Sequence, residues 1–109
     1  MTSESAKRKV LGLVGLGLRG RLAIVGVQQV RDAAKRGKLK IALVESDASQ
    51  NSLDKVDSLL AARRVTTVRD FSGRELGEVA GREVVAVIGV SDAGLAKGIA
   101  DAIAADSRR

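Results

Sequence analysis

The sequence predicts an α/β protein, a three-layer α/β/α sandwich formed by a single domain. Its 109 residues are close to the size of one ordinary domain and too few for two independent cores. Helical and strand patterns alternate along the chain, and two strand patterns, Leu39 to Glu45 and Val84 to Val90, are nearly continuous apolar runs. Such runs are typical of central strands that helices cover on both faces, and this arrangement gives three layers.

Each element is predicted from its own local pattern. Val27, Val30 and Ala34 share one face of an amphipathic helix that Gly37 ends. Ser72-Gly73-Arg74-Glu75 has the spacing of a capping box, and Asp92 is placed to cap the last helix, whose apolar stripe is formed by Leu95, Ile99, Ala102 and Ile103. The expected order is helix 8–19, strand 22–25, helix 27–36, strand 39–45, helix 51–64, strand 65–69, helix 72–80, strand 84–90 and a final helix after residue 92.

The composition excludes most familiar enzyme classes. The chain has no Cys and no His, so disulfides, thiol chemistry, imidazole acid–base catalysis and the usual zinc, copper or haem ligand sets are absent. Phe71 is the sole aromatic residue, and the core must therefore be aliphatic. No apolar run approaches the roughly 20 residues that span a bilayer, and the stretch after the basic N-terminus is broken by glycines and runs into Arg19 and Arg21. We expect a cytoplasmic protein without a signal peptide, cofactor, metal, membrane partner or small-molecule substrate.

The positive charge is concentrated in the first part of the sequence. Residues 1–40 contain ten Lys or Arg against Glu4 and Asp32, a net charge of +8, and the remainder carries −2. A one-sided basic field favours a polyanionic partner such as nucleic acid, although a solvated basic surface is an equally simple interpretation. Five cations lie in or just after one predicted helix and are expected to neutralise phosphates together; they are Arg31, Lys35, Arg36, Lys38 and Lys40.

Three motifs offer enzymatic or nucleotide-binding alternatives. Residues 15–20 read Gly-Leu-Gly-Leu-Arg-Gly, the GxGxxG of dinucleotide-binding loops, but the residues after it predict a strand where that motif needs a helix. The segment around Ser91 lacks the last glycine of a nucleophile elbow, and no His could act as its base. Glu45 and Asp47 follow a strand, as catalytic carboxylates often do, yet a lone acidic pair is usually a solvated loop. The sequence therefore predicts a protein that is not an enzyme.

Several segments, in order, resemble the kink-turn-binding ribosomal proteins, the group that includes L7Ae and L30e, and in particular its small bacterial members. The resemblance covers nearly the whole chain. The segments that carry it are Leu13-Val14-Gly15-Leu16, residues 26–37 from Gly26 to Gly37, Leu39-Lys40-Ile41-Ala42-Leu43-Val44-Glu45-Ser46-Asp47-Ala48-Ser49, Glu75-Leu76-Gly77 with Ala80-Gly81, Arg82-Glu83-Val84-Val85, and Asp92-Ala93-Gly94-Leu95-Ala96-Lys97.

The resemblance implies a mixed four-stranded sheet and a site for folded RNA on a single, monomeric domain covering residues 1–109, with a flexible basic N-terminus at 1–7. It implies that Gly26 brings backbone close to RNA, that Gln28 and Gln29 address tandem G·A pairs, and that Arg31 and Lys35 meet phosphates. The loop Arg82-Glu83-Val84 would cover a flipped-out nucleotide. The RNA partner would be ribosomal RNA or another kink-turn-like RNA.

Asp32 departs from the family pattern. Kink-turn binders of this group carry Asn, Glu and then Lys where this sequence has Gln28, Gln29 and Asp32. A negative charge thus stands where a phosphate-facing cation is usual. Two further hypotheses therefore remain beside folded-RNA binding: a protein-interaction module of the same fold with a degraded RNA site, and a nucleotide-binding protein.

Overall fold

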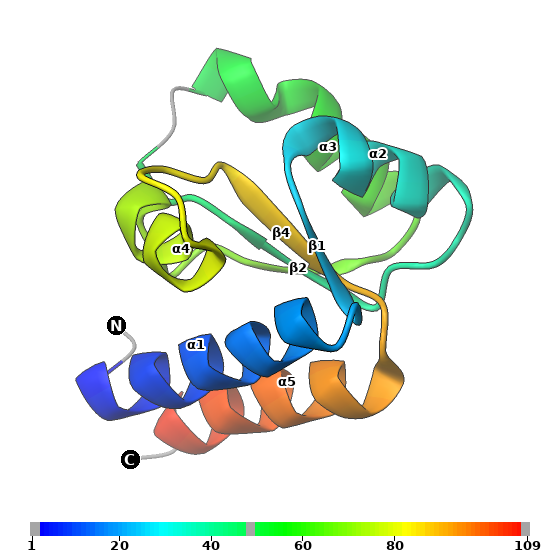
Figure 1. Ribbon diagram of the computed structural model, residues 1–109. Helices are drawn as coiled ribbons and strands as arrows, with labels where there is room; N and C mark the ends of the chain where they lie inside the picture. Colours follow the sequence, from blue (N-terminus) through cyan, green and yellow to red (C-terminus); the bar gives the residue numbers. More distant parts are fainter. Residues whose placement is uncertain (1–2, 48–49, 108–109) are drawn as a thin grey trace.

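The protein is an open four-stranded sheet with helices on both faces (Figure 1). The structure is a computed structural model that describes residues 3–47 and 50–107. Its elements are α1 (Glu4–Arg19), β1 (Ala23–Val25), α2 (Val27–Lys35), β2 (Ile41–Val44), α3 (Gln50–Ala62), β3 (Thr66–Val68), α4 (Gly73–Ala80), β4 (Val87–Val90) and α5 (Ala93–Ser107). The predicted α/β class and the order of its elements are confirmed.

The sheet is mixed, with strand order β1-β4-β2-β3. β4 runs antiparallel to both of its neighbours, and β2 pairs with β3 in parallel. Because β2 and β4 occupy the centre, all four residues of each are buried, as their continuous apolar sequences predict. The mixed four-stranded sheet implied by the resemblance is therefore present.

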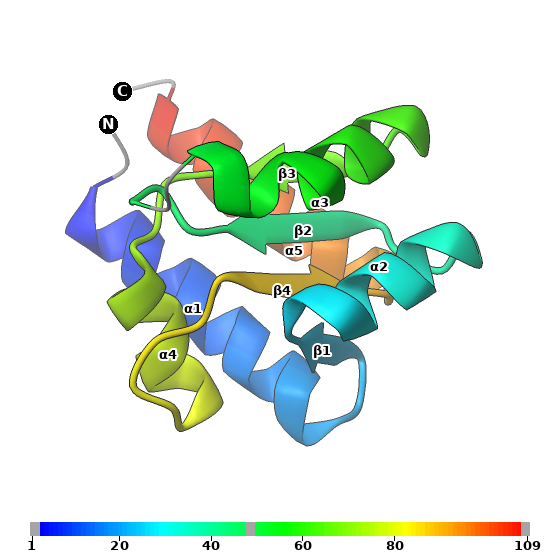
Figure 2. The same cartoon turned by 90° about the horizontal axis from the view of Figure 1, so that it is seen from above.

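Two aliphatic cores lie on opposite faces of the sheet and complete the three layers (Figures 1 and 2). One core joins the sheet to α1, α4 and α5 around the fully buried Phe71, Leu43 and Ile88. The other joins it to α2 and α3 around Val30 and Leu60. Among the described residues no polar or charged residue is buried, so hydrophobic burial is the main source of stability. None of the described helices is both long and apolar enough to cross a membrane.

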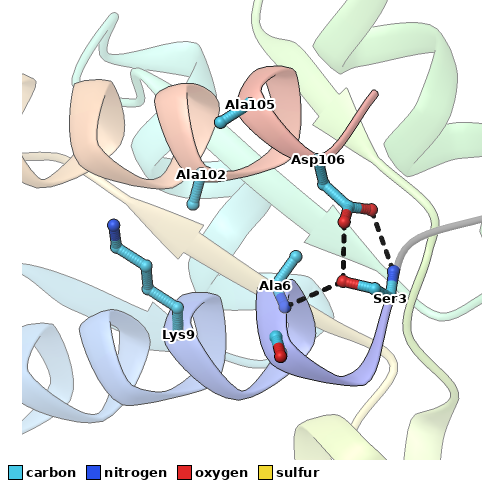
Figure 3. A pocket seen from close by; sticks show the side chains of 7 residues that line it. Ser3, Ala6, Lys9, Ala102, Ala105 and Asp106 are labelled. Carbon is cyan, nitrogen blue, oxygen red and sulfur yellow. Dashed lines mark hydrogen bonds between the residues drawn. The ribbon is translucent and has the colours of Figure 1, made fainter. Parts of the chain in front are cut away.

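Helix α1 begins four residues earlier than predicted. Ser3 caps it by accepting a hydrogen bond from the Ala6 N–H through its Oγ at 3.2 Å. Ser3 in turn donates to the two carboxylate oxygens of Asp106 in α5, at 2.6 and 2.9 Å, beside a small hollow between the two helices (Figure 3). Residues 4–7 are therefore the first turn of a helix, within the stretch 1–7 for which the sequence predicted a flexible N-terminus; residues 1 and 2 lie outside the described part.

The glycines of the GxGxxG segment allow close helix packing. Gly15 and Gly17 are buried within α1, and a Cβ on Gly17 would collide with the Leu95 side chain of α5. Gly20 then ends the helix and a strand follows, the reverse of the strand-then-helix order that a dinucleotide loop requires. The buried glycines of this segment thus serve the packing of α1 against α4 and α5.

Candidate nucleic-acid interface

The start of α2 is an open helix N-terminus fixed to the sheet. Its N-cap, Gly26, has φ 108° and ψ 150°, a conformation that is strained for any residue with a Cβ. The Gly26 N–H donates to the Val87 carbonyl of β4 at 3.1 Å, which holds the helix start beside the first residue of that strand. No side chain caps α2 and no acid lies in its first turn. The free N–H groups and the positive end of the helix dipole therefore remain available to an anion.

The two predicted base-reading residues are exposed on the first turn of α2. The Gln28 Nε2 donates to the Asp32 Oδ1 one turn later at 3.0 Å. Gln29 folds back over the N-cap, because its Oε1 would lie 2.5 Å from a Cβ built on Gly26. Asp32 thus occupies a donor of Gln28 as well as adding a negative charge.

The loop Arg82-Glu83-Val84 is the second part of the interface and is exposed along its whole length. Its backbone is tied to α4 at both ends, since the Arg82 N–H donates to Gly77 at 2.8 Å and the Val85 N–H donates to Gly73 at 2.9 Å. Val84, 59% exposed, presents an apolar side chain to solvent next to the start of α4. A rigid loop with an exposed apolar residue can cover a base.

These two parts meet at one end of the sheet. The loop leads into β4, whose first residue, Val87, binds Gly26, and the neighbouring Ala86 carbonyl accepts from the Glu45 N–H at 2.8 Å. We call the surface formed by Gly26, Gln28, Gln29, Arg31, Asp32 and residues 82–84 the α2–loop surface. Lys35 is not part of it, because it lies in the last turn of α2, about 13 Å along the helix from Gly26 at 1.5 Å per residue.

Arg31 lies one turn into α2, between Gly26 at the start of the helix and Lys35 in its last turn, and is half-buried. Its Nε is shielded from solvent and has no hydrogen-bond partner among the described residues. A ligand oxygen could accept a hydrogen bond from this Nε–H and so satisfy a strong donor. This possibility fits the predicted contact of Arg31 with a phosphate.

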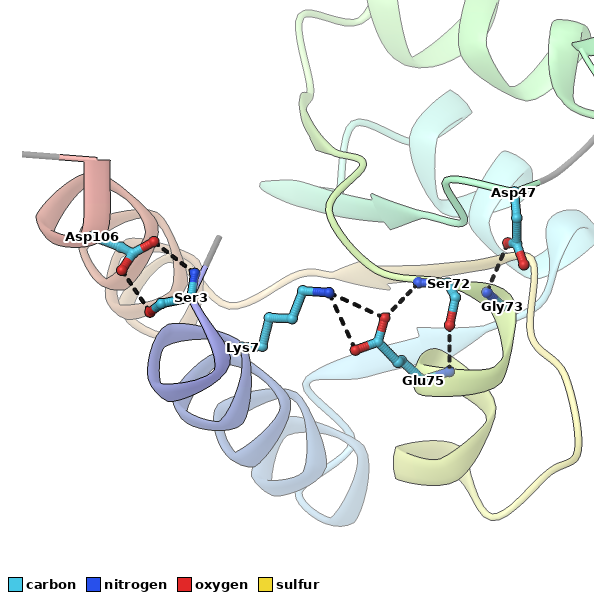
Figure 4. Close-up of polar contacts among 7 residues, drawn as sticks. All are labelled: Ser3, Lys7, Asp47, Ser72, Gly73, Glu75 and Asp106. Atoms are coloured by element: carbon cyan, nitrogen blue, oxygen red, sulfur yellow. Dashed lines mark hydrogen bonds and ion pairs between the residues drawn. The ribbon is translucent and has the colours of Figure 1, made fainter. Parts of the chain in front are cut away.

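Glu45 is a neighbour of this surface that the sequence singled out only as a catalytic alternative. Its carboxylate lies against Gly73 and close to Val84. Burial, and secondarily the charge of Asp47, raise the pKa of Glu45. Asp47 itself accepts a hydrogen bond from the Gly73 N–H at 3.0 Å and so caps α4 (Figure 4). The position of Asp47 is therefore explained by helix capping.

The start of α4 is held by the capping box that the sequence predicted (Figure 4). Ser72 Oγ accepts from the Glu75 N–H at 3.1 Å, and Glu75 Oε1 accepts from the Ser72 N–H at 2.9 Å. Lys7 of α1 donates to the Glu75 carboxylate at 3.4 Å. The Ser72 backbone hydrogen bond first, and then Lys7, lower the pKa of Glu75 against an opposing effect of burial. This network fixes the helix on which the 82–84 loop rests.

Comparison with known proteins decides the family. The model of the ribosomal protein L7Ae/L30e/S12e/Gadd45 family matches residues 8–100, most of the chain. The chain belongs to this family. Among relatives, the RNA-binding protein YlxQ of Enterococcus faecium is 30% identical over 95 residues, which cover 87% of this chain and 91% of that protein.

Solved structures of the same fold span nearly the whole chain. A Bacillus halodurans protein of unknown function is 29% identical with a TM-score of 0.80, over 88% of this chain and 97% of its own. The Giardia lamblia 15.5kD RNA binding protein has a TM-score of 0.76 at 17% identity, over 99% and 92%; at that identity the likeness shows the fold alone. The suspected resemblance to the L7Ae and L30e group is therefore confirmed.

Proposed function

We propose that this protein is a non-catalytic, cytoplasmic RNA-binding protein that recognises folded, kink-turn-like RNA through the α2–loop surface, in association with the ribosome. The observation that carries the proposal is the meeting of an uncapped helix N-terminus at Gly26 with the exposed, tethered loop 82–84. Membership of the family and the name of the YlxQ relative support RNA as the ligand.

The chemistry of α2 suits a folded RNA. Amide side chains such as Gln28 and Gln29 pair with base edges in a widened groove, and the open N–H groups of the helix bind phosphate. Phe71 is fully buried and the chain has no other aromatic residue, so no aromatic platform exists for stacking single-stranded bases. Val84 instead provides an aliphatic contact for one displaced base.

The test is a mobility-shift titration with a kink-turn RNA and an RNA of equal length whose tandem G·A pairs are replaced by Watson–Crick pairs. We expect tighter binding of the kink-turn RNA by the wild type. Gln28→Ala or Gln29→Ala should cost roughly 1–3 kcal/mol against the kink-turn RNA and much less against the control RNA. Equal binding of both RNAs by the wild type and by these variants would contradict recognition through α2.

A substitution series at Asp32 separates charge from hydrogen bonding. Asp32→Asn removes the charge and retains an acceptor for Gln28, whereas Asp32→Lys adds a cation and releases the Gln28 amide. We expect affinity for the kink-turn RNA to rise from wild type to Asn and again to Lys, with stability nearly unchanged because the position is exposed. Asp101→Lys on α5, across the sheet, is the matched charge control and should leave the preference for the kink-turn RNA unchanged.

The Gln28–Asp32 hydrogen bond also favours the alternative of a protein-interaction module, because it occupies a donor of the base-reading amide. That alternative predicts that no member of the Asp32 series changes RNA affinity.

A further inference from the structure

The end of the sheet opposite the α2–loop surface gathers half of the Lys and Arg side chains that form no ion pair within the described residues. The pairings Ala23↔Val90, Val90↔Ile41 and Ile41↔Thr66 form one row across all four strands. The segments next to this row are residues 19–22, 36–40, 63–65 and 91–92, which we call the basic end. They come from distant parts of the sequence and meet only because of the strand register, and the two views place them at the same end of the sheet (Figures 1 and 2).

The basic end carries seven cations and one acid. The cations are Arg19, Arg21, Arg36, Lys38, Lys40, Arg63 and Arg64, and all are exposed. The acid, Asp92, accepts a hydrogen bond from the Leu95 N–H at 2.8 Å and caps α5. Within residues 3–47 and 50–107, none of the seven cations takes part in an ion pair; the ion pairs found there use Lys7, Arg69 and Lys97. The net charge of the basic end, +6, equals that of the whole chain.

The α2–loop surface carries no net charge, and its acidic neighbours make this end of the sheet negative. Arg31 and Arg82 are opposed there by Asp32 and Glu83, with Glu45 and Asp47 close by. The five cations that the sequence assigned to one RNA contact are divided by the fold, because Arg36, Lys38 and Lys40 lie at the basic end. A surface without excess positive charge cannot supply the phosphate attraction that accounts for most non-specific RNA affinity.

The backbone of the basic end is also unusual. Among the described residues, only Arg21 and Arg64 combine a side chain with a left-handed backbone, at φ 61° and 58°. Both residues lie in the turns that end α1 and α3, where the Leu22 N–H donates to Gly17 and the Val65 N–H donates to Leu60, and a left-handed residue at such a helix end is usually glycine. Both of these residues are exposed arginines at the basic end.

We propose that the basic end is a second RNA-binding surface, which holds the phosphate backbone of an RNA helix without reading its sequence. The identity of the ligand rests on the RNA binding proposed above. Four strands at about 4.8 Å spacing give the row a width of roughly 14 Å, enough for several phosphates. Lys and Arg there can contact phosphates, but no aromatic side chain is present to stack on bases. The protein would thereby bridge a recognised RNA motif and a neighbouring helix.

The test compares two triple variants with equal loss of charge. The first variant removes three cations from the basic end, each from the segment that precedes a different strand: Arg19→Gln before β1, Lys40→Gln before β2 and Arg63→Gln before β3. The second variant is the control and removes three exposed cations that lie elsewhere on α1 and α3, by Arg8→Gln, Lys9→Gln and Lys55→Gln. Affinity for an unkinked RNA duplex is measured by fluorescence anisotropy from 50 to 200 mM salt, after thermal unfolding has established that both variants are folded.

We expect the log–log salt slope on the duplex to fall by about 2–3 in the basic-end variant and by less than about 1 in the control, taking about 0.9 for each phosphate contact in duplex DNA as the guide. The preference of the basic-end variant for the kink-turn RNA over the mutated RNA should be the same as that of the wild type. Equal slopes for the two variants overturn the second surface. Binding to anionic phospholipid vesicles is measured in parallel. If the basic-end variant loses vesicle binding while its RNA affinity is unchanged, the second RNA surface is also overturned and the basic end is assigned to a membrane.

The result is separable from the proposed function. If α2 does not recognise kink-turns, the Gln28, Gln29 and Asp32 variants have no effect while the duplex slopes still differ. If only the basic-end proposal is wrong, the kink-turn preference persists and the slopes agree.

Discussion

Gly77 and Gly12 are two helical glycines for which the structure predicts opposite effects of the same change to alanine. A Cβ on Gly77 in α4 would lie 2.6 Å from the Glu83 carbonyl oxygen and 2.8 Å from the Arg82 carbonyl oxygen. A Cβ on Gly12 in α1 meets nothing within 4 Å. Gly→Ala within a helix is worth about 0.8–1 kcal/mol in propensity, and only Gly77 opposes this gain with a steric cost.

The magnitude follows from what the new methyl group contacts. Overpacking costs about 1–3 kcal/mol, and the upper part of that range applies at Gly77 because carbonyl groups of the backbone cannot rotate away as a side chain can. After the propensity gain, Gly77→Ala should destabilise the protein by about 1–2 kcal/mol. Gly12→Ala should stabilise it by about 0.5–1 kcal/mol. For a domain of this size the melting temperatures should move apart by roughly 6–13 °C.

Urea unfolding followed by circular dichroism, together with RNA titration, tests this reasoning. Gly77→Ala displaces the 82–84 loop and should weaken kink-turn RNA binding, whereas Gly12→Ala should leave it unchanged. If Gly77→Ala proves neutral or stabilising, the loop moves at no cost and is not the rigid element inferred here.

Two further changes test the local structure around the α2–loop surface. Because the folded-state pKa of Glu75 is lowered, its carboxylate stabilises the fold above the unfolded-state pKa, and this contribution is lost as the pH falls through the folded-state value. Glu75→Gln should therefore be less stable than wild type at pH 7, by about 0.2–1 kcal/mol for a partly exposed ion pair, and urea titrations should show the difference disappearing as the pH falls from about 4.5 through the folded-state pKa; a constant difference would refute the assignment. Gly26→Ala should cost about 1–3 kcal/mol, since φ 108° is strained for alanine, and should weaken kink-turn RNA binding; unchanged urea midpoints would show that the helix start adapts freely.

Local patterns predicted most of the fold because each was self-contained. The capping box needs only Ser72 and Glu75, and the central strands needed only unbroken apolar runs. The start of α1 could not be predicted in this way. Its cap, Ser3, is held by Asp106, 103 residues away, a contact that exists only once α1 and α5 have packed together. Strand β4 begins at Val87, later than the predicted Val84, because Val84 belongs to the exposed loop.

The candidate site was predicted only in part, because the sequence does not show at which end of the sheet each charged residue lies. Gly26 and the 82–84 loop were identified by resemblance, and the structure brings them to one end of the sheet. The distribution of charge depends on strand register and therefore could not be predicted from the sequence. Lys40 follows Arg31 closely in the chain, yet its N–H donates to Val90, at the opposite end of β4 from Val87.

This division of charge leads to a prediction about salt. If the α2–loop surface supplies discrimination and the basic end supplies phosphate attraction, raising the salt concentration should weaken binding of kink-turn and mutated RNA in parallel. The ratio of the two affinities in the wild type should then stay within about twofold from 50 to 200 mM salt, because hydrogen bonds to base edges are screened far less than long-range charge interactions. In the Asp32→Lys variant, which adds a cation to the α2–loop surface, the same ratio should fall with salt. A steep fall in the wild type would show that phosphate contacts of Arg31 and Arg82 dominate the salt dependence, and that the basic end does not supply most of the phosphate attraction.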